Sequence, residues 1–410
     1  MIKQNAQVIL GKDIDQGGNV EWVDSITSKP RNLPSIIELN SQKTPTALAV
    51  TGKVWSHILK HNEGLAKDLA YYIRVHGRCT PLDKVSVVSY FVKMGFMTLM
   101  CGDGGNDCGA LKTAHVGIAL SDAEASVVSP FTSMDKSIES VVDVLKEGRC
   151  ALCSALASYK YMIMYGQVET INQVVCAWFA ITPGDWNWIF MDGIWVIIMA
   201  FTLPLAKAAK KLAPSRPTSS LLGPHTMSST CGILAINFFF VAIALYLLHQ
   251  QDWFQCRKWD GGKGLANLSY ICDNYETSVI FVISGYQYIN SAIPYNFGFA
   301  YRADWIKNYI FVFFAVIFTI LHFYTTLVPG SVSCLFRVNC VNEKVVPDPF
   351  GDLIPIQNSF HTTVMPMDFR VILISLMIMN LAANIIWEYF IVNGNYRWLK
   401  SYKYKVEQGV

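Results

Sequence analysis

The sequence predicts an α/β domain followed by an all-α bundle of six transmembrane helices. The 410 residues are 52% hydrophobic and only 15% charged, whereas a soluble domain averages about 25% charged residues. The apolar excess is uneven, because residues 1–150 have the composition of a soluble domain and nearly all the surplus follows residue 155. We therefore expect a cytosolic domain at 1–150 and a membrane domain at 151–410.

Composition also excludes several classes of protein. The formal net charge is +3 and the chain contains no Lys/Arg-rich run, so a nucleic-acid partner is not expected. A chain this apolar must bury its surface, which excludes disorder. Met1 is followed by polar residues, so no secretory signal peptide is expected.

Short apolar runs alternate with amphipathic stretches in the first domain. The alternation of apolar runs and amphipathic stretches is typical of a parallel sheet of the Rossmann kind. Residues 1–45 have no steady hydrophobic period, and 29–34 are expected to form a loop. Strands are expected at 47–50, 97–100 and 116–120, and helices at 54–59, 65–73, 84–94, 108–115 and 137–150.

Six apolar segments follow, and a spanning helix needs about 20 mostly apolar residues. The fourth is short and polar, with Ser284, Gln287 and Asn290, so its neighbours would have to shield it. An even number of spans returns the C-terminus to the side of the N-terminal domain, which places both termini in the cytosol. The segments lie near 157–182, 187–206, 228–249, 277–294, 306–328 and 370–392.

Loop chemistry predicts which side each loop faces. Lys and Arg residues show a modest bias toward the loops on the side of residues 1–150. The opposite loops contain Cys256 and Cys272, Cys334 and Cys340, and a glycosylation sequon at Asn267. Disulfides and glycans belong to a lumenal or outside face. Unpaired thiols and an unused sequon are the alternative interpretation.

The segment from Cys101 to Lys112 has the residues of a phosphate or metal site. Asp103 lies on a glycine turn directly after a predicted strand, at the carboxyl end of a parallel sheet, where ligands of such folds bind. Gly102 and Gly104 let the backbone approach a phosphate or metal closely. Asp103 and Asp107, with Asn106 between them, suit Mg²⁺, which prefers one or two carboxylates. By spacing alone, a plain surface turn fits equally well.

Upstream of this turn, Lys84 opens a predicted helix. A lysine in that position can neutralise charge on a transferring phosphoryl group.

Ionisable residues inside membrane segments are costly and usually functional. Tyr165 and Glu169 recur at helical spacing on one face of the first span, Asp192 lies well inside the second, and Asp185 marks its entrance. Carboxylates between tyrosines suit a linear polycation better than a metal ion. The alternative for Glu169 is a buried carboxyl that is neutral or paired, for example with Lys160, which we otherwise expect at the cytosolic interface.

The turn Gly102-Asp-Gly-Gly-Asn-Asp107, followed by Ala-Leu-Lys112, resembles the hinge motif of P-type ATPases, whose phosphorylation domain is haloacid-dehalogenase-like. The longer run from Met100, with Glu124-Ala-Ser-Val-Val-Ser-Pro-Phe-Thr-Ser133, resembles the type V subgroup B, which exports polyamines from late endosomes and lysosomes. The resemblance continues through Lys160-Tyr-Met162, Gln251-Asp-Trp-Phe254, Asn274-Tyr-Glu276 and Ser284-Gly-Tyr-Gln-Tyr288.

The resemblance implies Mg²⁺ and ATP as cofactors and assigns roles to these residues. Asp103 is similar to the Mg²⁺ ligand, Asn106 and Asp107 to its supporting neighbours, and Lys84 to the lysine that contacts the phosphorylated aspartate. The resemblance also points to a cation path along Tyr165, Glu169, Asp185 and Asp192. The family more often has an uncharged amide-type residue near Glu169.

Three strings typical of the family do not occur in the 410 residues: Asp-Lys-Thr-Gly-Thr, with its phosphorylated aspartate, Thr-Gly-Glu and Thr-Gly-Asp-Asn. The nucleotide-binding insertion, the actuator domain and the first four helices have no counterpart in the resemblance either. We therefore expect the C-terminal part of an ATP-driven cation pump, inactive by itself.

Its expected partners are the lipid bilayer, a cationic substrate such as a polyamine, and the missing N-terminal part, in a late endosomal, lysosomal or other internal membrane. Two alternatives stay open: a non-catalytic membrane scaffold or regulator, and a P-type pump with another cargo, a metal ion or a lipid.

Overall fold

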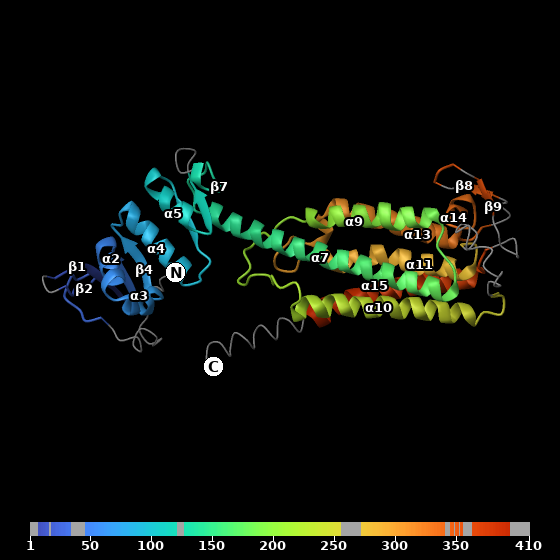
Figure 1. The fold of residues 1–410 in the computed structure, drawn as a ribbon, viewed down its shortest axis with the longest axis horizontal. Helices are drawn as coiled ribbons and strands as arrows, with labels where there is room; N and C mark the ends of the chain where they lie inside the picture. Colours follow the sequence, from blue (N-terminus) through green and yellow to red (C-terminus); the bar gives the residue numbers. More distant parts are fainter. Residues whose placement is uncertain are drawn as a thin grey trace. The chain divides into compact units, whose positions relative to one another are not determined.

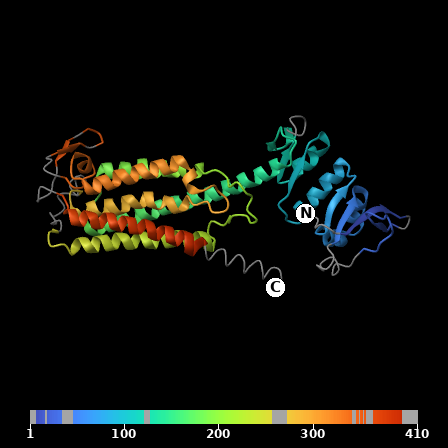
Figure 2. The ribbon, with the colours of Figure 1, turned by 180° about the vertical axis from the view of Figure 1, so that it is seen from behind.

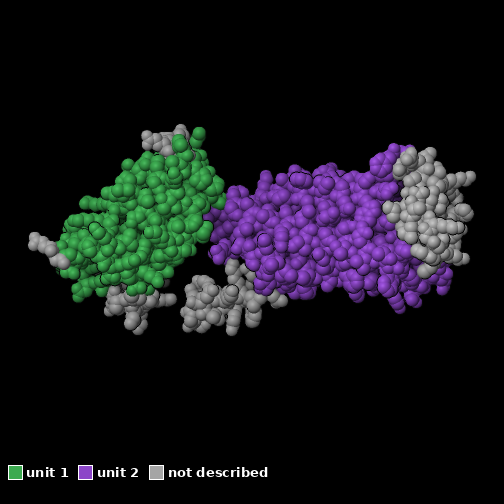
Figure 3. Space-filling view, in the orientation of Figure 1, with its two compact units in different colours: residues 1–144 green, residues 145–410 purple. Residues whose placement is uncertain are grey.

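The computed structural model describes two compact units, Met1–Val144 and Leu145–Val410 (Figure 3). Each unit is described here by itself. Within them, the described residues are 7–15, 18–33, 46–120, 127–255, 272–340, 345–347, 349–351, 353–355 and 363–393.

A four-stranded sheet opens the first unit, in the order β2-β1-β3-β4. Strands β1, β3 and β4 run parallel, and β2 pairs antiparallel with β1. Leu48, Trp55 and Leu69 are almost fully buried in its core. The strands are Gln7–Ile14, Val20–Asp24, Thr46–Thr51 and Ile73–Gly77, and the helices α2 Gly52–His61, α3 Glu63–Ala70 and α4 Pro81–Lys93.

A second, three-stranded sheet follows, in the order β5-β6-β7 with all strands parallel. Between β5 and β6 the chain forms a 3₁₀ turn and the short helix α5. The bounds are β5 Leu99–Gly102, 3₁₀ turn Gly105–Asp107, α5 Cys108–Thr113, β6 Val116–Ala119 and β7 Phe131–Thr132.

The alternation of strands and helices is confirmed, but the single Rossmann-like sheet is not. The described strands of the first unit fall into two sheets. The predicted helix over 65–73 ends at Ala70, because Ile73 and the residues after it pair with β3 as strand β4. The irregular stretch before Pro45 contains β1 and β2, which the local pattern did not reveal.

The second unit is built from long helices (Figures 1 and 2). Helix α7 runs unbroken over Glu139–Phe179, so the predicted helix at 137–150 and the first span are one helix. The other helices are α8 Asp185–Trp188, the π-helical η2 Ile189–Val196, α9 Ile197–Thr202, η3 Leu203–Leu205, α10 Pro224–His249, α11 Tyr275–Asn290, α12 Ala292–Tyr295, η6 Trp305–Lys307, α13 Tyr309–Leu327, α14 Ser331–Leu335, α15 Met367–Ile386 and the π-helical η7 Trp387–Val392. Two short strands, β8 Val345–Pro347 and β9 Leu353–Pro355, pair antiparallel.

Four helical segments of the described chain are long and apolar enough to cross a membrane, by length and composition. Helices α7 and α11 are not among them. All 16 residues of α11 are buried, and α11 packs against α10, α13 and α15. The expected shielding of the polar fourth segment is therefore confirmed. The four segments are Asp185–Leu205, Pro224–His249, Tyr309–Leu327 and Met367–Val392.

Candidate functional site

A cavity of about 430 Å³ lies at the carboxyl end of β5 in the first unit. Gly102 ends this strand and Asp103 follows it, while Asp107 ends the next 3₁₀ turn. Lys84 reaches the cavity from the first turn of α4. The structure thus brings together four of the predicted site residues, since Lys84, Gly102, Asp103 and Asp107 all line this cavity.

Lys84 and Asp107 form an ion pair across the cavity. The Lys84 Nζ lies 2.7 Å from the Asp107 Oδ1, and the Asp107 side chain is only 11% exposed. The start of α4 is fixed by a capping box between Thr80 and Asp83. Hydrogen bonds donated by the Thr80 backbone and by Ser56 lower the pKa of Asp83, so its carboxylate is charged near neutral pH. Lys84 therefore projects from the start of a helix whose first turn is fixed by these hydrogen bonds.

Gly102 and Gly104 differ in what surrounds them. A Cβ added at Gly102 would lie 2.7 Å from the Cβ and Oδ2 of Asp107, whereas one added at Gly104 would meet nothing within 4 Å. Of the two positions, only 102 therefore has to be a glycine, because Asp107 lies directly against it. Burial, together with the charges of Asp103 and Asp107, raises the pKa of the neighbouring Cys101 thiol.

The side chains of this turn fit a magnesium ion better than a metal that needs many protein ligands. Asp103 is exposed and Asp107 is buried, so one carboxylate is open to solvent and the other is held by Lys84. Within the described residues, no group of three or more His, Cys, Asp or Glu side chains is gathered for a metal. Mg²⁺ needs only one or two carboxylate ligands from the protein, because water and phosphate oxygens fill its other coordination positions. Asn106 is exposed in the same turn and does not line the cavity.

A second cluster lies within the helices of the other unit, around Glu169. The Tyr288 hydroxyl donates to its Oε2 at 2.7 Å, and the Gln173 Nε2 donates to its Oε1 at 3.0 Å. The ring of Tyr165 lies 5.9 Å from that of Tyr288. Tyr288 was not among the predicted site residues, although it ends the motif Ser284-Gly-Tyr-Gln-Tyr288 in the fourth predicted span.

Asp192 belongs to this cluster and Asp185 does not. Asp192 lies in the π-helical segment η2, a feature frequent at functional sites. It interacts electrostatically with Glu169, and its Oδ1 is buried with no hydrogen-bond partner among the described residues. Asp185 is the exposed first residue of α8. The preceding Gly184 lies against Arg337, which pairs with Asp273 at 3.1 Å from both carboxylate oxygens.

Lys160 is buried and pairs with Glu388 rather than with Glu169. It is only 8% exposed, and its Nζ lies 2.7 Å from the Oε1 of Glu388 and 2.9 Å from the Oγ of Ser229. The ammonium also lies 4.6 Å from the centre of the Tyr295 ring. A buried cation is tolerated with a carboxylate partner, and Glu388 supplies it from 228 residues away.

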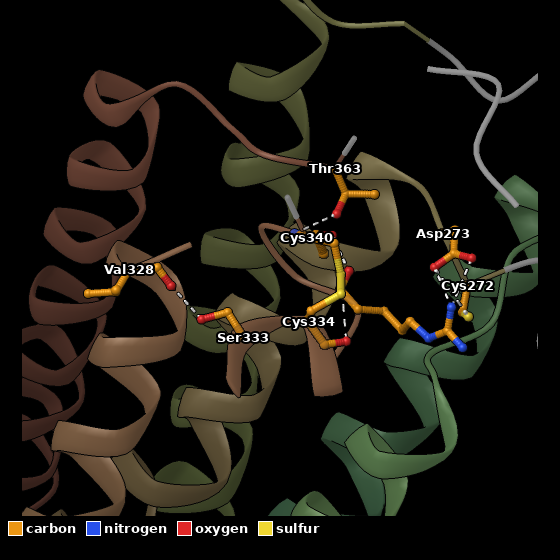
Figure 4. The surroundings of a disulfide bond; sticks show 9 residues. Cys272, Asp273, Val328, Ser333, Cys334, Cys340 and Thr363 are labelled. Atoms are coloured by element: carbon orange, nitrogen blue, oxygen red, sulfur yellow. Dashed lines mark hydrogen bonds and ion pairs between the residues drawn. A yellow bond between two sulfur atoms is a disulfide. The ribbon is translucent and has the colours of Figure 1, made fainter. Parts of the chain in front are cut away.

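One of the two predicted disulfides is confirmed. Cys334 and Cys340 are bonded, and the backbone N–H of Cys340 donates to the Thr363 hydroxyl (Figure 4). For the other pair, Cys256 lies outside the described residues, as does the sequon at Asn267.

Comparison with known proteins identifies the group to which the chain is related. It is 33% identical over 317 residues to the human "Polyamine-transporting ATPase 13A3", covering 73% of this chain and 26% of that protein. It is 26% identical over 395 residues to the Gallus gallus "Probable cation-transporting ATPase 13A4", covering 90% of this chain and 31% of the relative. The "Vacuolar cation-transporting ATPase YPK9" of Saccharomyces cerevisiae is 29% identical over 309 residues, 74% of this chain and 20% of that protein. No family model matches the chain.

These homologues and the four apolar segments identify a membrane protein of the P-type ATPase class. The chain belongs to the P5B group of that class. It spans about a quarter of the length of the human relative.

Proposed function

We propose that this chain supplies the magnesium-binding part of the catalytic domain and the cation path of an ATP-driven P5B pump, with a polyamine as its cargo. The observation that carries the proposal is the grouping of Asp103, Asp107 and Lys84 around one cavity at the end of β5. In this proposal the surrounding domain is haloacid-dehalogenase-like, and the pump uses ATP.

Asp103 and Asp107 would hold Mg²⁺, and the bound ion would neutralise charge on a transferring phosphoryl group. The ammonium of Lys84 adds a fixed positive charge at the same cavity. Gly102 leaves room for the Asp107 carboxylate, and the Lys84–Asp107 pair holds that carboxylate in one orientation. These residues bind and orient, and the group that accepts phosphate would come from another segment.

The cation path in this proposal runs past Glu169, Asp192, Tyr165 and Tyr288. Two carboxylates that influence each other electrostatically attract a polycation, since its amines can pair with both. Tyrosine rings add cation–π attraction for the amines. They are not among the usual ligands of metal ions. Asp185 would act at the entrance of the path.

Orientation and location are part of the same proposal. The Cys334–Cys340 disulfide favours a lumenal face for its end of the bundle. Residues 1–150 and both chain termini would then face the cytosol, in a late endosomal, lysosomal or other internal membrane.

A chimera tests the proposal. This chain would replace the segment of the human relative with which it aligns, and the purified chimera would be assayed for polyamine-stimulated, Mg²⁺-dependent phosphoenzyme turnover. We expect turnover in the chimera and none in its Asp103→Asn variant, because one carboxylate of the magnesium site is lost. Asp68→Asn, on the surface helix α3, is the matched control.

The chain by itself should form no acid-stable, hydroxylamine-sensitive phosphoenzyme with labelled ATP. A chimera that folds but never turns over would favour the non-catalytic scaffold or regulator. Turnover stimulated by a metal ion or a lipid rather than by polyamines would reassign the cargo. Unchanged turnover in Asp103→Asn would contradict the magnesium site.

A further inference from the structure

A second cavity, of about 180 Å³, lies within the helical unit, and a free cysteine and a buried arginine both line it. Cys153 comes from helix α7, and Arg302 comes from the segment between α12 and η6. None of the described residues that line this cavity belongs to the turn with Asp103 and Asp107 or to the cluster around Glu169. The cavity has room for small molecules of the size of water, each of which occupies about 30 Å³.

The positive charge of Arg302 is not balanced by a carboxylate in the described lining. Arg302 is only 2% exposed. Glu388 is the sole carboxylate among the described lining residues, and it is already paired with Lys160 at 2.7 Å. Burial lowers the pKa of Arg302, and the nearby thiols of Cys153 and Cys150 oppose that shift. Two thiols are thus the acidic groups that interact with this guanidinium.

The guanidinium of Arg302 also has unused N–H donors. Its Nη2 donates to the carbonyl oxygens of Tyr295 and Phe297, at 2.6 and 3.2 Å. Its Nε and Nη1 are buried and have no hydrogen-bond partner among the described residues. A Cβ added at Gly298 would overlap the Cβ of Arg302, so the backbone of this segment packs directly against the arginine side chain. Arg302 is therefore held in place with buried donors that lack an acceptor, which is costly.

An oxygen atom on the sulfur of Cys153 would supply the missing acceptor. The thiol itself is a weak acceptor. A sulfenate carries its negative charge on oxygen, and hydrogen bonds between ionised groups are about twice as strong as those between neutral ones. The side chain of Cys153 is partly exposed and faces the cavity, so a small oxidant can reach it.

We propose that Cys153 is an oxidation site, at which hydrogen peroxide converts the thiol to a sulfenate that Arg302 stabilises. The sulfur attacks one peroxide oxygen, and the S–O bond forms while the O–O bond breaks. The second oxygen leaves with the thiol proton as water, and the peroxide gains the two electrons that the sulfur loses. The sulfenic acid then releases its proton to solvent and pairs with the guanidinium. This proposal does not depend on the proposed pump activity.

The neighbouring Cys150 is badly placed to form a disulfide with Cys153. The two residues lie three positions apart on the unbroken helix α7, where such Cβ atoms are about 5–6 Å apart. A disulfide needs Cβ atoms about 3.5–4.5 Å apart. Cys150 is also buried, and its thiol donates to the carbonyl oxygen of Ala206. We therefore expect the sulfenate at Cys153 to persist.

The test treats the full chain, purified in detergent micelles, with hydrogen peroxide and then removes the peroxide with catalase. The chain is next unfolded in excess dimedone, which traps sulfenic acids, so access to the cavity does not limit trapping. Mass spectrometry of peptides gives the rate of oxidation at each cysteine. Cys153 should be oxidised at least about tenfold faster than the more exposed Cys231, because only its product gains charge-assisted hydrogen bonds from Arg302.

Substitutions separate the role of Arg302 from that of its surroundings. Arg302→Gln should lower the rate at Cys153 to that at Cys231, and Arg302→Lys should keep most of the preference, because the positive charge remains. Lys307→Gln removes a positive charge from a partly exposed side chain further along the chain and should change nothing. Cys150→Ser should leave the yield at Cys153 unchanged.

Because Arg302 also holds two carbonyl groups, its variants can be unstable, but the comparison of Cys153 with Cys231 needs no variant. Oxidation of Cys231 as fast as that of Cys153 would overturn the proposal. An unchanged rate in Arg302→Gln, with an unchanged melting temperature, would overturn the role of Arg302. A yield that rises in Cys150→Ser would mean that the two cysteines form a disulfide, and it would overturn the lasting sulfenate.

Discussion

Single residues decide how closely the groups around the first cavity approach one another. Asp107 is nearly buried and held by Lys84, so its carboxylate has little freedom to move. Gly102 lies directly against that carboxylate, while Gly104, two residues later, faces open space. The two glycines of one turn therefore offer a matched pair of substitutions.

Gly102→Ala should destabilise the three-stranded sheet of β5, β6 and β7, whereas Gly104→Ala should not. The new methyl group at position 102 would overlap Asp107. The shifts needed to remove such an overlap destabilise the folded state by about 1–3 kcal/mol. A surface substitution without neighbours changes stability by about 0.5 kcal/mol or less. Hydrogen exchange of the backbone amides of β5 and β6 in the full chain measures the difference. Equal exchange in the two variants would contradict the close approach.

Tyr288→Phe tests the cluster around Glu169. The substitution removes the hydroxyl that donates to Glu169 and keeps the ring that faces Tyr165. Since one such hydrogen bond contributes about 0.5–1.5 kcal/mol, the half-saturating polyamine concentration of the chimera should change by about two- to tenfold. Tyr246→Phe, 62% exposed on α10, is the control. A similar shift in both variants would remove Tyr288 from the path.

At the scale of helices and strands, the sequence predicted local features well and long-range pairings poorly. Helix α4 and strands β3 and β6 follow local apolar patterns, and they were predicted close to their bounds. Strands β1 and β2 depend on pairing with each other and with β3, which no local pattern encodes.

The same limit applies to the sites. The turn with Asp103 and Asp107 is a contiguous motif, and its residues were predicted. Tyr288 lies 119 residues from Glu169 along the chain, and Glu388 lies 228 residues from Lys160. Periodicity within one helix cannot reveal such partners, because only the packing of several helices brings them together.

A buried group of amides joins three of these helices. The Asn237 Oδ1 on α10 accepts from the Nδ2 atoms of Asn380 and Asn384 on α15, both at 3.0 Å. The Asn290 Nδ2 on α11 donates to the Oδ1 of Asn380 at 2.7 Å. All four side chains are at most 1% exposed. Each amide thus depends on the others, so helices α10, α11 and α15 should resist separation as a group.

Asn237→Ala should lower the free energy of unfolding by about 2 kcal/mol. It removes three side-chain hydrogen bonds to oxygen or nitrogen partners, each contributing about 0.6 kcal/mol in a membrane protein, besides a weaker one to the Met164 sulfur. Thermal unfolding in detergent micelles measures the loss. Phe238→Ala removes a larger side chain from an exposed position of the same helix and should have the smaller effect. The reverse order would show that the amides contribute little.

At the scale of the whole molecule, the two ends of the helical unit differ chemically. One end contains the Cys334–Cys340 disulfide and the buried Arg337–Asp273 pair. The loop between η3 and α10, at the other end, contains Lys207, Lys210, Lys211 and Arg216. Basic loops tend to stay in the cytosol, and disulfides persist in oxidising compartments. Both properties therefore favour the proposed orientation.

Cysteine labelling tests that orientation. Lys210 and Asp252 are both exposed, and they lie in the loops before and after α10. The background replaces by serine Cys256 and the free cysteines of the described residues that are not buried, Cys79, Cys101, Cys108, Cys153 and Cys231. In it, Lys210→Cys should react with a membrane-impermeant maleimide added to the cytosolic side of sealed vesicles. Asp252→Cys should react only after the vesicles are permeabilised, because α10 is long enough to separate the two positions by a bilayer. Labelling of both positions from one side would mean that α10 does not cross the membrane, and labelling in the opposite order would place the disulfide in the cytosol, where a lasting disulfide is not expected.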